Sequence, residues 1–315
     1  MSALPLPVAA IVGVTTGHPP AVDLQTLLLD WLWRPFPIGV DVALLAAAGW
    51  YLRSVDQLDA RGRHWSWWRT AAFMSGLLTV WLALCSSVAT LAESSFAFHI
   101  TQKLLLMVIA PPLGALGAPM TLLLQTSNRR LKTGVLRGLH SRVFGVVRHP
   151  VPVFFMYYLS MYAFFLSGAI GFAMEHMWLM DLINLGFLIS AMLFWWPMVG
   201  VDPIPGGRMN SGLKIINLLV GVPLMSFLGM ALMEKRTSVA AMYSLRSTHL
   251  GGAVLWIAGD AATLLAVIPI YVEWVRSDAR LAKRIDARLD AGKPVPAPAP
   301  AGAGMAATLR SLRRG

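Results

Sequence analysis

The sequence predicts an all-α polytopic membrane protein: a bundle of seven transmembrane helices with its N-terminus outside and its C-terminus in the cytoplasm. Hydrophobic residues make up 57% of the 315 positions and charged residues only 13%, and the mean hydropathy is +0.63. A soluble domain usually carries about 25% charged residues. The apolar residues gather in seven runs that are long enough, or nearly so, to cross a hydrocarbon core of about 30 Å.

The seven runs follow one another closely, which indicates one transmembrane domain over residues 38–275. In order, they are 38–54, 70–92, 96–115, 151–172, 177–199, 212–233 and 250–275. Residues 1–37 precede them as an extracytoplasmic segment without the basic start of a cleavable signal peptide. Residues 276–315 form a basic cytoplasmic tail, helical at first and predicted to be disordered in its Pro/Ala-rich part from residue 293.

The positions of the basic residues set the orientation. Most of the 26 Lys and Arg residues fall in the tail and in the connections after the first, third and fifth runs. The positive-inside rule places these segments in the cytoplasm. The net charge of +11 is therefore explained by topology, and we expect the lipid bilayer, not nucleic acid, as the partner of this charge.

Ionisable residues within the predicted helices include Lys103 in the third, Asp181 in the fifth and Asp260 in the seventh, while Asp41 lies near the outer end of the first. Charges inside a membrane are costly, and they usually face a partner or a cavity. At a rise of about 1.5 Å per residue, Lys103 and Asp181 lie at similar depths, whereas Asp260 lies near the midplane. We therefore expect Lys103 and Asp181 to form an ion pair, either as a structural lock between two helices or as part of a site.

Imidazole and thioether groups gather at the predicted outer ends of the helices. They are His99, Met174, His176, Met177 and His249. Thioethers favour Cu(I), and imidazole accommodates both oxidation states of copper. The pattern predicts a copper site at this outer rim. The alternative is that the histidines are simply solvated and the methionines pack as ordinary apolar residues.

The third helix contains Pro111 and Pro112, so we expect a kink or break in its cytoplasmic third. The backbone groups that lose their partners there need new ones from neighbouring helices or from water in a cavity. Broken helices occur at binding sites of transporters, although a single break without a counterpart is a weak indication.

Three sequence blocks resemble the CtaG-type cytochrome c oxidase assembly proteins of bacteria. They are FAFHITQKLLLMVIAPPLGALGAPMTLL at 96–123, FWWPMVGVDPIP at 194–205 and LGGAVLWIAGD at 250–260. Their order and spacing also fit that family. The resemblance implies a seven-helix factor in a bacterial plasma membrane that helps to assemble a haem-copper terminal oxidase. It also implies the oxidase subunits as partners and a suspected role in copper delivery to the CuB centre.

The sequence departs from this family at the expected metal ligands. Members usually show a His-Met-x-x-x-His motif at the start of the third helix, but here Ile100 follows His99 and Lys103 replaces the second histidine. Gly186 stands where a histidine is common in the fifth helix. An ammonium group in place of an imidazole removes a ligand and disfavours a nearby cation. Either copper binding has moved to the outer rim, or the chain has kept the fold and lost the metal.

The leading interpretation is an oxidase assembly or copper-handling factor and not an enzyme. No nucleophile, base and orienting group can be assembled from the sequence, and the single Cys, Cys85, excludes a two-cysteine metal or redox site. One alternative is a metal or small-solute transporter, for which paired discontinuous helices and internal repeats are expected. Another is a structural scaffold subunit of the respiratory complex, which would stay with the oxidase after assembly.

Overall fold

Every regular element that the structure describes is a helix, which confirms the predicted all-α fold. The computed structural model describes residues 35–139, 150–202, 209 and 211–290. Two predicted segments, 1–34 and the Pro/Ala-rich tail from residue 293, lie outside them. The chain divides into two compact units, Met1–Ile270 and Tyr271–Gly315.

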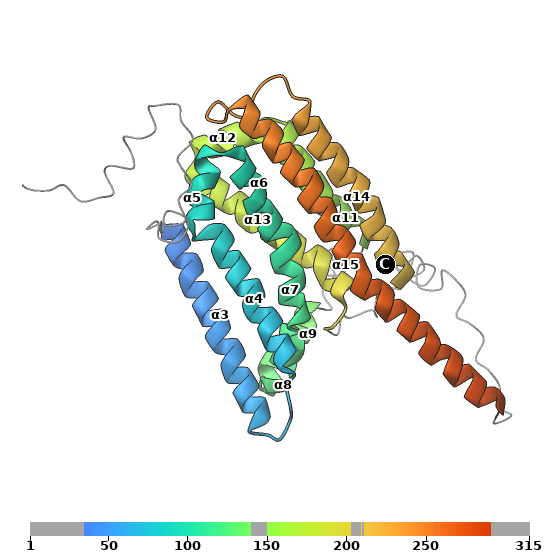
Figure 1. Ribbon diagram of the computed structural model, residues 1–315. Coiled ribbons are helices and arrows are strands. Elements are labelled where there is room, and N and C mark those ends of the chain that lie inside the picture. Colours follow the sequence, from blue (N-terminus) through green and yellow to red (C-terminus); the bar gives the residue numbers. More distant parts are fainter. Residues whose placement is uncertain (1–34, 140–149, 203–208, 210, 291–315) are drawn as a thin grey trace, which may run out of the picture. The chain divides into compact units, whose positions relative to one another are not determined.

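The helices follow the predicted apolar runs, with more subdivision than expected (Figure 1). They are α3 (Pro35–Asp59), α4 (Trp67–Leu84), α5 (Ser87–Ser94), α6 (Phe96–Leu104), the π-helix η3 (Leu105–Ile109), α7 (Ala110–Leu116), α8 (Pro119–Thr126), α9 (Arg129–Leu139), α11 (Pro150–Leu166), α12 (Ala169–Glu175), α13 (Met177–Val199), α14 (Ser211–Met233) and α15 (Leu245–Asp290). In the described ranges, six segments are long and apolar enough to cross a membrane, or seven if α11 and α12 form one bent span.

The fourth predicted span differs from the expectation because it contains a sharp bend. Residues 151–172 are apolar almost throughout and were predicted to form one span, but α11 and α12 meet at an angle of 76°. The bend occurs at Gly168, whose φ of +79° lies in the left-handed region. A glycine adopts this conformation without the steric penalty of a Cβ atom. The hydropathy of the run does not reveal this local turn.

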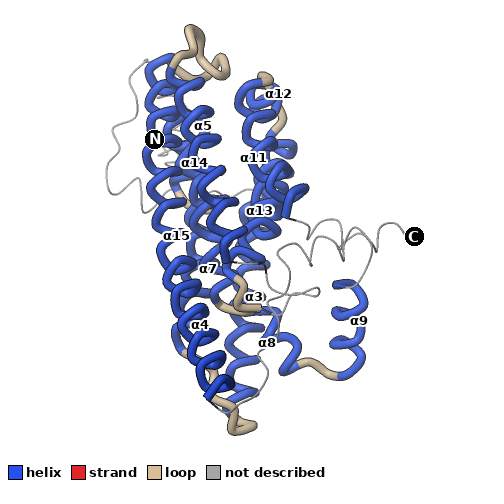
Figure 2. Tube along the Cα trace, turned by 90° about the vertical axis from the view of Figure 1, so that its right-hand side faces the viewer, coloured by secondary structure: helices blue, strands red, loops and turns tan. Residues whose placement is uncertain are grey.

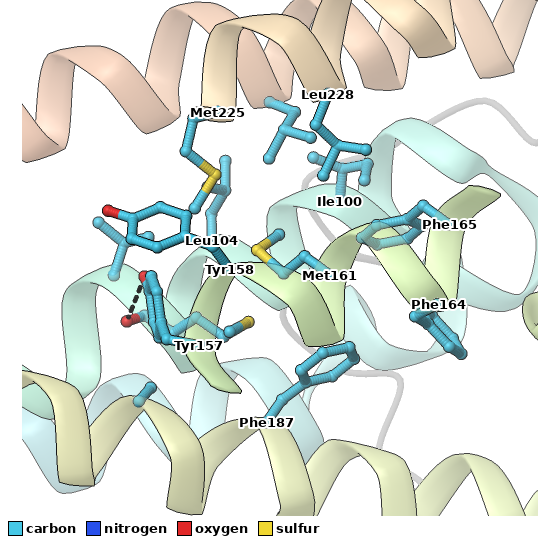
Figure 3. Close-up of a cluster of buried hydrophobic side chains, with 14 of the residues drawn as sticks. Ile100, Leu104, Tyr157, Tyr158, Met161, Phe164, Phe165, Phe187, Met225 and Leu228 are labelled. Carbon is cyan, nitrogen blue, oxygen red and sulfur yellow. Dashed lines mark hydrogen bonds between the residues drawn. The ribbon is translucent and has the colours of Figure 1, made fainter. Parts of the chain in front are cut away.

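Pro111 and Pro112 produce a π-helix and not a break. The π-helix η3 stands directly before them, and both prolines begin α7. Because proline has no N–H, the carbonyl of Met107 loses its α-helical donor at residue 111 and its π-helical donor at residue 112. Two side chains from neighbouring helices replace these donors: Tyr157 of α11 at 3.2 Å (Figure 3) and Trp195 of α13 at 2.8 Å.

The largest cluster of buried apolar side chains joins α6, α11, α13 and α14 (Figure 3). Helix α11 contributes Tyr157, Tyr158, Met161, Phe164 and Phe165 to it. The ring of Tyr157 stacks on that of Phe194 of α13, with 4.4 Å between their centroids. These aromatic contacts fix α11 against α13 and so set the position of the polar groups described below.

Helix α8 is tied to the segment after α13 by a buried carboxylate. Ala118 has a left-handed conformation with φ of 49°, which turns the chain between α7 and α8. Asp202 then accepts hydrogen bonds from the backbone N–H groups of Met120 and Thr121 and from the Thr121 hydroxyl. These are the unpaired donors of a helix N-terminus. Burial raises the pKa of the Asp202 carboxyl above its ordinary value of 3.8, although these hydrogen bonds act in the opposite direction.

Within the first unit, α5 and α12 lie toward one end and α8 toward the other (Figure 2). We call the end with α5 and α12 the α12 end. The turns between α5 and α6 and between α12 and α13 belong to it. In the predicted topology this end faces outward.

Candidate functional site

A cavity of about 250 Å³ opens at the α12 end. Helices α5, α6, α12 and α13 supply most of its walls. Its polar lining residues are Glu93, His99, Gln102, Asp181 and Asn184, and four methionines also line it: Met174, Met177, Met180 and Met242. The structure therefore brings three residues of the predicted outer rim, His99, Met174 and Met177, to one cavity.

The ammonium group of Lys103 is completely buried at this site, with 0% of the residue exposed. It donates hydrogen bonds to the side-chain oxygens of Asn184 at 2.5 Å and of Gln102 at 3.1 Å. The rings of Phe164 and Phe187 face the same ammonium group, with their centroids 5.8 and 5.9 Å from Nζ. Amide oxygens and aromatic faces both stabilise a positive charge.

The predicted partner of Lys103, Asp181, lies in the wall of the cavity and interacts electrostatically with the ammonium group. The hydrogen bonds of Lys103 go to two neutral amides, Gln102 and Asn184. Asn184 lies three residues after Asp181 in α13, so both face the same side of that helix. The carboxylate thus supplies charge, and the amides supply the directional contacts.

His99 is buried and held in one orientation. The hydroxyl of Tyr243 lies 2.6 Å from the carbonyl oxygen of Ala92 and 3.2 Å from Nδ1 of His99. Because the single hydroxyl proton goes to the carbonyl, Nδ1 carries the ring proton and donates it to the Tyr243 oxygen, an assignment that follows from the hydrogen-bond network. The lone pair of a neutral imidazole is then on Nε2, which is buried and has no hydrogen-bond partner among the described residues.

The other two predicted rim histidines point elsewhere. Nδ1 of His176 lies 3.0 Å from the carbonyl of Phe172, and the two rings pack together at 4.6 Å between centroids. Nε2 of His249 lies 2.9 Å from the carbonyl of Lys235. Neither histidine belongs to the lining of the cavity. Similar depth in the bilayer therefore did not bring them to His99, because each ring satisfies a nearby backbone carbonyl.

Asp260, the third predicted buried charge, also lies outside the lining of this cavity. One of its carboxylate oxygens accepts a hydrogen bond of 2.5 Å from Ser226 of α14, and the other is buried without a partner in the described part of the chain. This contact joins α14 to α15, which is the structural role expected of a polar pair between membrane helices.

Sequence reasoning missed three residues that shape the site: Gln102, Asn184 and Tyr243. None of them carries a charge, so they gave no signal in a search for ionisable groups within apolar runs. For Asn184 there was a usable indication, since an amide one turn away from the intramembrane Asp181 shares its helix face. Tyr243 lies between the sixth and seventh predicted spans, where sequence alone does not place it against His99.

The donor groups of the cavity do not make a complete metal centre. In the described part of the chain, no three His, Cys, Asp or Glu side chains come close enough together to hold a metal ion. The cavity offers one imidazole and several thioethers, which are Cu(I) ligands, but they share the site with a buried ammonium group.

Residues 49–277 match the model of a family described as cytochrome c oxidase caa3 assembly factor (Caa3_CtaG). Uncharacterized proteins of Mycobacterium bovis and Mycobacterium tuberculosis are each 26% identical to the chain over 278 residues, and one of Mycobacterium leprae is 26% identical over 283 residues. These alignments cover 82% of the chain and 42% of each relative, so the chain spans less than half the length of these relatives. No solved structure matches the chain.

Proposed function

Because the chain belongs to the cytochrome c oxidase caa3 assembly factor family, we propose that it helps to assemble a haem-copper cytochrome c oxidase in a bacterial plasma membrane. Its partners in this role are subunits of the terminal oxidase. The family match carries the proposal, since it extends from residue 49 to residue 277 and includes every element of the cavity wall except the start of α3. We further propose that the chain is a chaperone-type factor and not an enzyme.

Copper delivery is a narrower form of this proposal, and the chemistry of the cavity supports it only in part. The free Nε2 of His99 and the surrounding thioethers are suitable Cu(I) ligands. Against a resident copper ion stands Lys103, whose ammonium group is buried beside the single imidazole and has its own hydrogen-bond partners. The residues present do not fit a resident copper ion, so the proposed assembly role includes no step through bound copper.

The test is deletion of the gene in its host, followed by purification of the terminal oxidase and measurement of its haem and copper content. We expect less assembled oxidase and a lower metal content per oxidase, and we expect the wild-type gene to restore both. A normal amount of fully metallated oxidase in the deletion strain would contradict the assembly role. If the chain co-purifies in stoichiometric amount with the mature oxidase, it is a structural subunit and not a transient factor.

A further inference from the structure

The surroundings of Lys103 have the composition of a cation site. Two amide oxygens, from Gln102 and Asn184, accept hydrogen bonds from Nζ, and the rings of Phe164 and Phe187 add their negative faces. The Asp181 carboxylate supplies a compensating negative charge. These groups are acceptors or carriers of negative charge, so they suit a positively charged amine.

His99 stands one helical turn before Lys103 on the same face of α6. Side chains four residues apart in a helix have Cβ atoms about 5–6 Å from each other, and the charge of Lys103 acts on the His99 ring. The buried lone pair on Nε2 of His99 is the best metal ligand that the cavity offers. Any cation bound there would therefore face an ammonium group at close range.

We infer that Lys103 is a fixed internal cation that takes the place of a bound metal ion in the cavity at the α12 end, so that the chain acts without copper of its own. This inference rests on the proposed assembly function for its meaning in the cell, but its chemistry is tested on the purified chain alone. Coulomb repulsion from Nζ of Lys103 weakens the affinity of Nε2 of His99 for a cation. For a charge separation of about 5 Å and an effective dielectric constant of about 20, the affinity for a monovalent cation falls by on the order of 100-fold.

The experiment measures Cu(I) binding to the purified full chain in detergent, with a coloured chelator competing for the ion. We expect the wild type to leave Cu(I) with the chelator. Lys103→Met removes the ammonium group and adds a thioether, so its affinity for Cu(I) should rise about 100-fold. Lys103→Leu removes only the charge and is the matched control for the added thioether; it should give a smaller rise in affinity.

Removing Lys103 alone leaves Asp181 without its cation and endangers the fold. The variant Lys103→Met/Asp181→Asn leaves the net charge of the site unchanged. It should bind Cu(I) more tightly than the wild type but less tightly than Lys103→Met, which keeps the attraction of the Asp181 carboxylate. A further His99→Ala substitution should abolish the gained binding. Folding is followed by thermal unfolding in detergent, and bound Cu(I) should raise the melting temperature of the two Lys103→Met variants but not that of the wild type.

Two results would overturn the inference. One is tight, stoichiometric Cu(I) binding by the wild type that is lost in His99→Ala. The other is a folded Lys103→Met/Asp181→Asn variant that binds no more Cu(I) than the wild type. Neither result touches the assembly role, which is read from the oxidase of the deletion strain. Conversely, a normal oxidase in that strain would contradict the assembly role without changing the interpretation of the Cu(I) measurements.

Discussion

The carbonyl group of Met107 shows how single residues compensate for a sequence that disrupts a helix. Both of its possible backbone donors are prolines, Pro111 and Pro112, and no water is expected in a spanning segment to replace them. The donors come instead from Tyr157 and Trp195, two aromatic side chains of other helices. Because they arrive from α11 and α13, the missing backbone bonds become contacts between three helices.

We expect Tyr157→Phe to lower the free energy of unfolding by about 1 kcal/mol. Trp195→Phe should lower it by more, because the smaller ring also leaves a cavity in the core. The double variant should lose more than the sum of the two, because a buried carbonyl left with no donor adds a desolvation penalty of about 1–3 kcal/mol. Denaturant titration of the purified chain gives these values, with the exposed Tyr271→Phe as the control. Strictly additive losses would show that the two donors do not share this carbonyl.

At the scale of residues, the sequence indicated where the buried charges are, but it did not indicate which groups they contact. Lys103 and Asp181 were found because charges are rare in apolar runs, and Lys103 does stand buried beside the cavity. Its neutral partner Asn184 gave no such signal. His249 was placed at the rim by depth alone, but depth does not say which way a ring points, and its ring meets the carbonyl of Lys235.

At the scale of elements, the limits of prediction follow from what interrupts a helix. The bend between α11 and α12 depends on the backbone conformation of Gly168, and hydropathy does not report conformation. The two prolines correctly indicated an irregular helix at residues 105–112. They did not indicate its form, in which both prolines lie in the first turn of α7 after the π-helix η3. Likewise, nothing in the sequence indicated the bond of Asp202 to α8.

Asp202 makes the stability of this connection depend on pH. Its folded-state pKa is raised by burial above the ordinary value of 3.8, so the folded chain holds this proton over a pH range in which the unfolded chain releases it. The contribution of Asp202 to stability is therefore fully present below the unfolded pKa and is lost as the pH rises through the folded-state pKa.

The corresponding prediction compares the wild type with Asp202→Asn, which cannot ionise. The melting temperature of the wild type minus that of the variant should be larger at pH 4 than at pH 7. Any loss of hydrogen bonds to Met120 and Thr121 in the variant affects both pH values alike and cancels in this comparison. The exposed Asp59→Asn is the control for a general charge effect. An equal difference at both pH values would mean that the hydrogen bonds offset burial and that the pKa is not raised.

At the scale of the whole molecule, the apolar runs predicted an all-helical membrane protein, and the described residues agree with it. Two connections between helices of the first unit mark its two ends. The connection between α3 and α4 carries Arg61, whose guanidinium group donates to the carbonyl of Gln125 in α8. The connection between α14 and α15 carries Met242, which lines the cavity at the α12 end. The connection with Arg61 and the connection that lines the cavity therefore belong to opposite ends of the first unit.

The orientation of these ends in the membrane is tested by reporter fusions. The positive-inside rule places the basic connections in the cytoplasm and the α12 end outside. A reporter that is active only in the cytoplasm should be active when it is fused after Arg314 and inactive when it is inserted at Ser238, between α14 and α15. A periplasmic reporter at the same two positions should give the reverse and serves as the control for expression. The opposite pattern would put the cavity of His99 and Lys103 on the cytoplasmic side, where an oxidase subunit would have to meet it from within the cell.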